Sequence, residues 1–406
     1  MQLVRSPDRT DKLERLVAGA QFDVASCTVA PPASRSPLRF IHRATVPGRG
    51  STPLFKLLYT DICTNDCAYC ANRVGRDWPR TSFTPDELAS LFMELYDKRL
   101  VSGLFLSSGI GIDATRTMGE MVKTVDILRH RYDYQGYVHL KILPGASHDC
   151  VEAGSRLATR ISVNMEAPTA DHLARLSSKK HIFRDIVERM RWVKNLSAAH
   201  EGILPSGQTT QFVVGAAGET DANILTTVQG LYNEIGLRRV YFSAYRPAGD
   251  PRLANVRAAP AERAHRLYQV DWLLRVYGFS PTEIELALGR SGNLPVGKDP
   301  KLVIASKQPW LYPLDINTAS YEELVRVPGV GPTSAHRICD SRKSHTIGSV
   351  RDLQRMGVAV RRALPYIRFG GMLGWEKQLS FLPQLEEEPA RKAPALATAL
   401  EGGPDT

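Results

Sequence analysis

The stretch LFKLLYTDICTNDCAYC, residues 54–70, joins a short apolar run to three closely spaced cysteines. The run at 54–62 predicts a buried β-strand, because it is short and rich in residues that pack in sheets. Cys63, Cys67 and Cys70 follow it with the spacing C-x3-C-x2-C, while the chain has only 6 cysteines in 406 residues. Six cysteines are too few for a disulfide framework in a chain of this length. The tight group of three therefore indicates a metal site.

The kind of metal follows from the ligands and their spacing. Thiolates are the usual ligands of iron–sulfur clusters, and a short loop can hold three corners of a cubane cluster. With no fourth cysteine nearby, the last iron would stay open to a substrate or cofactor. A structural zinc site remains an alternative, although it normally pairs two C-x2-C units or adds nearby histidines. Three unrelated cysteines are the remaining alternative, and their density argues against it.

Strands and helices alternate along most of the chain. Short β-branched or apolar runs predict strands at 54–62, 103–108, 137–143, 160–165, 210–215 and 239–245. Helical patterns between them predict a parallel α/β sheet with right-handed crossovers. We expect a partial (β/α)6 barrel, with an open doubly wound sheet as the alternative. In either fold the active site lies at the carboxyl ends of the strands.

Composition divides the chain into five regions. We expect an N-terminal extension (1–50), the barrel (51–290), a proline-rich linker (291–313), a small all-α basic domain (314–375) and a disordered tail (376–406). The net charge of +10 and pI of about 9.3 permit binding to phosphate backbones without proving it. No apolar run is long enough for a membrane span and no signal peptide is evident, so we expect a cytoplasmic protein.

With Tyr69 at the aromatic position of C-x3-C-x-aromatic-C, the cysteine loop resembles the signature of the radical S-adenosylmethionine (SAM) superfamily. The resemblance implies a [4Fe–4S] cluster held by Cys63, Cys67 and Cys70, with SAM bound through its amino and carboxylate groups to the fourth iron. In that family the reduced cluster cleaves SAM to methionine and a 5′-deoxyadenosyl radical, which abstracts a substrate hydrogen. A reducing protein such as flavodoxin or ferredoxin is the implied electron donor.

The same resemblance implies cofactor contacts at later positions, and the order of these positions along the chain fits the family. Ser107, Ser108 and Gly109 stand where the family usually has Gly-Gly-Glu, so the acidic residue is missing here. The other implied SAM contacts are Tyr69 near the adenine, Asn164 and Glu166 at the ribose, Gly215, Gly218 and Glu219 near the adenine, and Tyr245 at the end of the sixth strand.

Structural roles remain open for several of these residues. Glu166 and Glu219 could instead stabilise the starts of the helices that follow them. Tyr245 could instead be a core residue. Lys141 and Arg246 are candidate anion contacts, with solvated surface cations as the commoner case. His42 and His139 are expected to be structural, and no catalytic side chain is predicted.

The segment LDINTASYEELVRVPGVGPTSAHRICDSRK, residues 314–343, resembles the helix-hairpin-helix DNA-binding motif, in the variant with an Asp-Ile-Asn-x-Ala lead-in. The resemblance implies that a Gly-x-Gly turn and the next helix N-terminus bind backbone phosphates of DNA. The implied contacts are Gly329, Val330, Gly331, Thr333 and Arg337. A second, degenerate copy follows around Gly357. A purely structural or protein-binding hairpin is the alternative.

Together the two halves resemble a bacterial family of radical SAM proteins described as acting in DNA modification or repair. The implied function is radical chemistry on DNA held by the hairpin. The first alternative is a tRNA- or RNA-modifying radical SAM enzyme, although such enzymes usually carry extra cluster cysteines or an RNA-binding β domain. The second is a non-enzymatic DNA-binding protein with a structural metal site.

Overall fold

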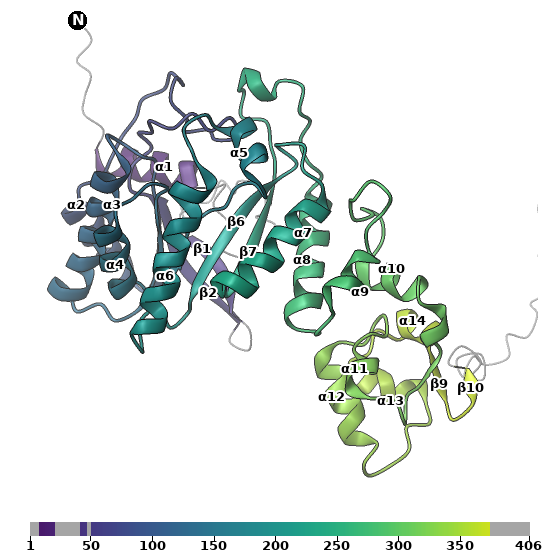
Figure 1. The fold of residues 1–406 in the computed structure, drawn as a ribbon. Helices are drawn as coiled ribbons and strands as arrows, with labels where there is room; N and C mark the ends of the chain where they lie inside the picture. Colours follow the sequence, from purple (N-terminus) through teal and green to yellow (C-terminus); the bar gives the residue numbers. More distant parts are fainter. Residues whose placement is uncertain (1–7, 21–40, 47–49, 374–406) are drawn as a thin grey trace, which may run out of the picture. The chain divides into compact units, whose positions relative to one another are not determined.

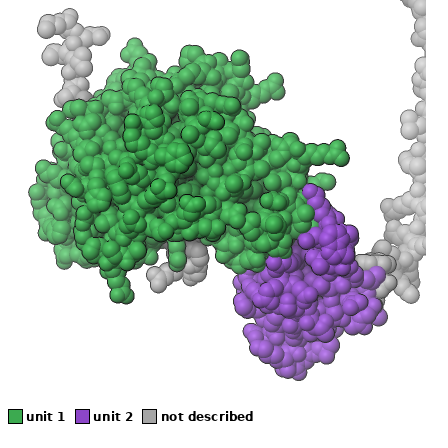
Figure 2. Space-filling view, viewed as in Figure 1, with its two compact units in different colours: residues 1–304 green, residues 305–406 purple. Residues whose placement is uncertain are grey.

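The computed structural model describes residues 8–20, 41–46 and 50–373. The chain divides into two compact units, residues 1–304 and residues 305–406 (Figure 2). The predicted tail at 376–406 lies outside the described residues. Within the described residues, no helix has the length and apolar character needed to cross a membrane.

Unit 1 is built on one seven-stranded sheet with its strands in sequence order (Figure 1). Its strands are β1 (Ile41–Val46), β2 (Gly50–Leu58), β3 (Gly103–Ser107), β4 (Tyr137–Lys141), β5 (Arg160–Ser162), β6 (Gln208–Val214) and β7 (Arg239–Ala244). Strands β2 to β7 are parallel, and β1 pairs antiparallel with β2. A doubly wound sheet reverses its strand order, and this one does not. The sheet curls into a half barrel, so the predicted partial (β/α)6 barrel is confirmed.

Most helices of unit 1 lie against the outer face of this sheet (Figure 1). Phe55 of β2 stacks on Phe92 at 6.5 Å between ring centroids, and Phe242 of β7 meets Tyr268 edge-on at 5.2 Å. The helices are α1 (Arg9–Gly19), α2 (Pro85–Asp97), α3 (Ala114–Asp126), α4 (His148–Leu157), α5 (Ala170–Leu176), α6 (Glu188–Ala199), α7 (Asp221–Gly230), α8 (Ala261–Arg275), α9 (Pro281–Glu285) and α10 (Pro300–Ser306), the last reaching into unit 2. Short π segments follow α3 and α7 and precede α6, at Ile127–Arg131, Leu231–Ile235 and Ile182–Val187.

Local sequence explains where these helices begin and end. Thr84 caps α2 by accepting a hydrogen bond from the Glu87 N–H at 3.3 Å, and the Glu87 carboxylate accepts from the Thr84 N–H at 2.8 Å. The helix predicted at 221–236 ends at Gly236, whose φ of +70° is the left-handed conformation that terminates helices.

Two elements in the N-terminal region were not predicted. Helix α1 lies against α2, where Lys12 bonds Glu87 at 3.0 Å and Arg9 bonds Glu94 at 2.7 Å. Strand β1 adds an antiparallel edge to the sheet. Described residues before position 51 therefore belong to the packed fold of unit 1.

Unit 2 is a small helical unit with a short sheet. Its helices are α11 (Tyr321–Leu324), α12 (Pro332–Ser341), α13 (Val350–Arg355) and α14 (Val360–Ala363), and its strands are β8 (Leu314–Asp315), β9 (Ile367–Phe369) and β10 (Met372–Leu373). Ser320 caps α11 and Ser349 caps α13, each as part of a capping box. The three-stranded sheet was not predicted, because its strands are only two or three residues long.

Candidate cofactor site and hairpin

The cysteine loop begins directly beyond β2, at the carboxyl end of the sheet. Gly109, after β3, lies so close to it that an added Cβ would stand 2.4 Å from the Ile62 carbonyl oxygen. Only glycine permits this approach. The neighbouring Ile110 N–H points at the Cys63 sulfur (3.4 Å), and the Ile110 carbonyl accepts from the Thr64 N–H at 2.7 Å. Gly109 thus supports the loop by its lack of a side chain.

The three thiols lie close enough to influence one another electrostatically. Burial raises the pKa of Cys70 to about 12, and the neighbouring Cys67 and Cys63 add to the rise. Burial likewise raises the pKa of Cys67, although the Lys180 ammonium favours the thiolate and opposes part of this rise. Among the described residues, no three His, Cys, Asp or Glu side chains are arranged to hold a single ion. Three thiols on one short loop are the ligand type that iron–sulfur clusters use, so the chemistry of this donor set fits a cluster.

A strap formed by residues 176–180, which begins at the last residue of α5, lies along the cysteine loop. The Leu176 carbonyl accepts from the Ala68 N–H at 2.8 Å. The Asp66 carboxylate accepts from the Ser177 hydroxyl at 2.5 Å and from the Ser178 N–H and hydroxyl at 3.1 and 2.8 Å. Lys179 donates to the Thr64 carbonyl at 2.6 Å. Sequence reasoning missed this strap, because nothing local in LSSKK points to a loop more than 100 residues earlier.

Lys180 brings a buried positive charge to the cysteines. Its ammonium donates to the Tyr69 hydroxyl at 3.1 Å and lies 3.6 Å from Glu166 Oε1, and both charged side chains are 8% exposed. Burial alone would lower the pKa of Lys180, but Cys67 and Glu166 raise it above its ordinary value. A buried cation next to thiolates offsets the charge that a thiolate-bound cluster concentrates there.

Glu166 occupies an unusual backbone conformation, with φ +64°. Two backbone hydrogen bonds, both of 2.9 Å, hold Glu166 in this conformation. The Glu166 N–H donates to the Gln211 carbonyl, and the Glu166 carbonyl accepts from the Val213 N–H. Such conformations cost about 1–3 kcal/mol and concentrate at functional sites. The Asn164 amide donates to the Glu166 carboxylate at 3.3 Å. The carboxylate is therefore aimed at Lys180 and Asn164, and it does not cap α5, whose cap is Thr169.

Two of the residues implied as cofactor contacts each carry a buried polar atom that has no hydrogen-bond partner among the described residues. These atoms are Ser108 Oγ and Asn164 Oδ1. Leaving a buried polar atom unpaired costs about 1–3 kcal/mol, so a ligand or water that bonds such an atom is favoured there. Together with the three thiols and Lys180, they fit the polar groups of SAM at a cluster.

The remaining implied contacts are placed by the ends of β3, β6 and β7. Ser107 ends β3 and is buried. The Glu219 carboxylate accepts from the N–H groups of Gly215 and Ala217, so it builds the turn after β6. Gly215 has φ +92°, and an added Cβ would stand 2.7 Å from Ala259 Cβ. Tyr245 is 2% exposed.

Arginines tie the cysteine loop to the loop after β7. Arg252 binds the Asp66 carboxylate at 2.9 Å, and Arg73 binds Asp250 at 2.8 Å. Since β2 and β7 are the two ends of the parallel sheet, these ion pairs connect its edges where the strands do not pair.

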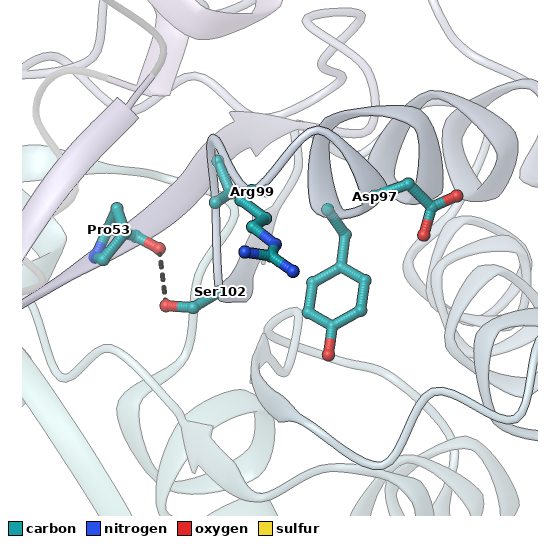
Figure 3. A pocket seen from close by; sticks show the side chains of 6 residues that line it. Pro53, Asp97, Arg99 and Ser102 are labelled. Carbon is teal, nitrogen blue, oxygen red and sulfur yellow. Dashed lines mark hydrogen bonds between the residues drawn. The ribbon is translucent and has the colours of Figure 1, made fainter.

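A separate hollow lies at the opposite end of the sheet (Figure 3). It is lined by Pro53, Tyr96, Asp97, Arg99, Val101 and Ser102. Ser102 donates to the Pro53 carbonyl at 3.1 Å, near the amino ends of β2 and β3. The hollow is therefore not part of the cysteine site.

In unit 2, the turn between α11 and α12 has the hairpin geometry. Gly329 has φ +88°, while Gly331 caps α12 in extended conformation. Val330 is 1% exposed and its N–H bonds the Val327 carbonyl at 3.1 Å, so Val330 stabilises the turn. Thr333 and Arg337 lie exposed on α12. The start of α12 thus presents an anion-binding geometry. Arg337 lies farther along the same helix, where its guanidinium donates to the Met356 carbonyl at 3.4 Å.

A second turn faces the first one. Gly357, between α13 and α14, has φ +84°. The Ala359 N–H donates to the Gly329 carbonyl at 2.8 Å, which joins the two turns. The degenerate second copy therefore has a hairpin-like shape, with Ala359 where the first copy has Gly331.

Family models match one segment in each unit of the chain. The family model of the Radical SAM superfamily matches residues 57–231, and that of the helix-hairpin-helix motif matches residues 313–357. The comparison with curated proteins gives no match.

Similar solved structures include the FeFe-hydrogenase maturase HydG from Carboxydothermus hydrogenoformans, with 12% identity, 54% of this chain and 50% of that chain covered, and a TM-score of 0.42. Streptococcus suis SuiB bound to S-adenosylmethionine has 11% identity, 54% and 47% coverage, and a TM-score of 0.41. Methylornithine synthase (PylB) has 12% identity, 53% and 60% coverage, and a TM-score of 0.44. The chain spans about half the length of the HydG and SuiB chains.

The match to the superfamily supports the prediction of an enzyme and implies a [4Fe–4S] cluster and SAM as its cofactors. Residues 57–231 thus form a radical SAM superfamily domain, and residues 313–357 contain a helix-hairpin-helix motif.

Proposed function

We propose that this protein is a radical SAM enzyme that acts on nucleic acid, with DNA modification or repair as its role. The observation that carries the proposal is the cysteine loop at the carboxyl end of β2, within the matched domain. Cys63, Cys67 and Cys70 would hold three irons of the [4Fe–4S] cluster. When bound, the cluster and SAM supply reductive SAM cleavage and a 5′-deoxyadenosyl radical, with electrons from a protein such as flavodoxin or ferredoxin.

The side chains around the loop support this chemistry. Ser108 and Asn164 offer the unpaired polar atoms that SAM would engage. Tyr69, whose hydroxyl accepts from Lys180, would contact the adenine. Backbone and hydroxyl groups of Ser107 and Ser108 would take the place of the missing acidic residue. Lys180 and Glu166 hold each other in place next to Cys67.

The hairpin supports nucleic acid as the substrate. Gly329, Val330 and Gly331 shape the turn, and Thr333 and Arg337 on α12 would contact backbone phosphates. Phosphate contacts position a protein on DNA without reading its sequence. A base buried in a duplex would have to be flipped out or single-stranded to reach the cysteine loop.

The first experiment tests the radical SAM activity. We expect anaerobically reconstituted protein to bind about four irons per chain and, with dithionite, to release 5′-deoxyadenosine from SAM. The Cys70→Ala variant should lose both. Cys150→Ala is the matched control, because Cys150 lies in α4, outside the cysteine loop. Full SAM cleavage by Cys70→Ala would contradict the proposal.

The second experiment tests the nucleic-acid substrate. SAM cleavage is measured with single-stranded DNA, duplex DNA and RNA of one sequence. We expect DNA to stimulate cleavage, and we expect the stimulation to fall steeply with salt because phosphate contacts release counterions. Stimulation by RNA alone would favour an RNA-modifying enzyme, and no stimulation by any of the three would contradict a nucleic-acid substrate.

A further inference from the structure

The loops next to the cysteine loop carry two strongly exposed apolar side chains. Ile112, after β3, is 72% exposed, and Phe183, three residues beyond the strap, is 70% exposed. Among the large apolar side chains that the structure describes in unit 1, these two are the most exposed. Single exposed apolar side chains are common, but two of them gathered beside a functional loop indicate contact with another molecule.

These two side chains belong to neighbouring segments at the carboxyl end of the sheet. The N–H of Gly145, after β4, donates to the Asp185 carbonyl at 3.1 Å, and a Cβ added to Gly145 would stand 3.7 Å from Ala114 Cβ. Ala114 is two residues after Ile112, and Asp185 is two residues after Phe183. Gly145 thus joins the segment of Ile112 to that of Phe183.

The turn that carries Phe183 is held by hydrogen bonds and by buried neighbours. The Asp185 N–H donates to the His181 carbonyl at 2.9 Å, and the Asp185 carboxylate accepts from the His181 N–H at 2.9 Å. The side chains of Ile182 and Ile186 are buried and anchor the segment in the core. The exposure of Phe183 is therefore a property of the folded segment and not of a frayed end.

Two exposed cations stand on either side of Phe183. Between residues 176 and 187 the exposed charged side chains are those of Lys179 and Arg184, while the single acid of this segment, Asp185, is buried. Lys179 has three N–H donors and directs one to the Thr64 carbonyl. Arg184 has five and directs two to Asp185, and its side chain is 67% exposed. Both cations therefore retain donors that a phosphate can accept from.

An exposed aromatic ring between two cations suits a single-stranded nucleic acid. Proteins bind such strands by stacking bases on aromatic side chains while cations attract the backbone. Phe183 is three residues after Lys180, whose ammonium bonds Tyr69, and three residues span at most about 11 Å. A base stacked on Phe183 would thus lie close to the cysteine loop, where the proposed chemistry requires an unpaired base.

We propose that Phe183 is a stacking platform for a base of single-stranded DNA, and that Lys179 and Arg184 contact the phosphates beside that base. The inference rests on the proposed function in taking DNA as the substrate, and it adds the place on the radical SAM domain where the strand lies. A duplex presents no open base face inside its stack, so this platform selects single strands or unpaired bases.

The test measures binding of fluorescent single strands to the cluster-reconstituted full chain by fluorescence anisotropy. One probe is an oligothymidine strand of about eight nucleotides, and the other has the same length and charge but abasic sugars in place of the bases. Phosphate contacts made by the hairpin are common to both strands, so the difference in their affinities reports stacking. We expect the oligothymidine to bind about five- to 150-fold more tightly, which corresponds to about 1–3 kcal/mol for one stacked base.

Variants locate the effect. Phe183→Ala should remove the preference for the strand with bases, Phe183→Leu should lose most of it because it has no ring face, and Phe183→Trp should keep it. Tyr132→Ala is the matched control, because Tyr132 is an exposed aromatic residue just before β4, at the opposite end of the sheet. A Phe183→Ala protein that keeps the preference, or a wild-type protein without one, overturns the proposal. Arg184→Gln should reduce the salt slope by about 0.7, the value of one phosphate contact on a single strand, and an unchanged slope overturns the role of Arg184.

The same variants separate DNA from other partners. If an RNA strand of the same length shows a preference that depends on Phe183 and the DNA strand shows none, the assignment to DNA is overturned. An acidic electron-donor protein would also be attracted to apolar and basic side chains. If Phe183→Ala leaves strand binding unchanged and raises the KM for reduced flavodoxin in SAM cleavage, this face serves the electron donor and the proposal is overturned.

The same preparations separate this inference from the proposed function. Iron content and 5′-deoxyadenosine release with dithionite report the radical SAM activity on their own. Protein that cleaves SAM but binds the abasic strand as tightly as the oligothymidine refutes the stacking platform alone. Protein that needs Phe183 for strand binding but never cleaves SAM refutes the proposed activity alone.

Discussion

The turn at Gly329 gives a sharp test of the hairpin, because its geometry allows a magnitude to be estimated. The left-handed φ of +88° costs a residue with a side chain about 1–2 kcal/mol. In addition, a Cβ there would stand 2.5 Å from the Ala359 carbonyl oxygen and 3.0 Å from Arg362 Cβ. The first neighbour is backbone and cannot turn away. We therefore expect Gly329→Ala to destabilise unit 2 by about 2–4 kcal/mol.

Hydrogen exchange followed by mass spectrometry reads this loss locally. Amide protection in α12 should fall at least about thirtyfold, since each 1.4 kcal/mol is a factor of ten. Peptides from β3 and β6 in unit 1 serve as an internal reference and should keep their protection. Gly348→Ala is the control, because nothing lies within 4 Å of an added Cβ and its φ is not positive. A Gly329→Ala loss below about fivefold, or one equal to that of Gly348→Ala, would refute the reasoning.

Three further predictions concern charge. Lys180→Met should lower the reduction potential of the reconstituted cluster, because a buried cation favours the more negative reduced state, and Lys179→Met should lower this potential less. An EPR-monitored redox titration measures both potentials, and equal shifts in the two variants would show that Lys180 has no special role. Cluster-free protein should lose stability as pH falls below about 6.5, by up to about 1.4 kcal/mol per pH unit. The reason is that burial depresses the pKa of His139 in the folded protein, so the unfolded chain takes up the proton first. Urea midpoints of His139→Gln should fall less as the pH drops, and the same pH dependence in this variant as in wild type would refute the role of His139. Arg337→Ala should weaken DNA binding and reduce its salt slope by about one phosphate contact, whereas a weakening that salt does not affect would point to a structural role for Arg337.

The sequence predicted the parts of the site whose signals are local. Cys63, Cys67, Cys70 and Tyr69 lie within one short segment, so spacing alone indicates their shared function. The alternation of strands predicted the sheet, and the sequential strand order then selected the half barrel over a doubly wound sheet. Gly329 and Gly331 were recognised in the same way, from one continuous motif.

What the sequence did not predict depends on contacts between distant segments. Lys180 lies more than 100 residues after the cysteines, and only the folded chain shows that its ammonium meets Tyr69. The contacts of Glu219 were not predicted for a similar reason: its carboxylate accepts from backbone amides that become neighbours only when the turn forms. Only the strand register shows that Lys56, Lys141 and Arg239 lie on one face of the sheet, because a shift by one residue moves every side chain to the other face.

The cysteine loop has no regular secondary structure, so other contacts must fix its ligands. Arg80 donates to the carbonyls of Asp61, Asn72 and Arg73 and holds the two ends of the loop together. Asp66 ties the middle of the loop to the strap at 176–180. None of these bonds uses a cysteine sulfur, so all of them can exist before a cluster arrives. The chain therefore preorganises its cluster site and loses less conformational entropy on binding than a free loop would. It follows that the apoprotein should keep the fold of this loop, with its amides still protected from hydrogen exchange.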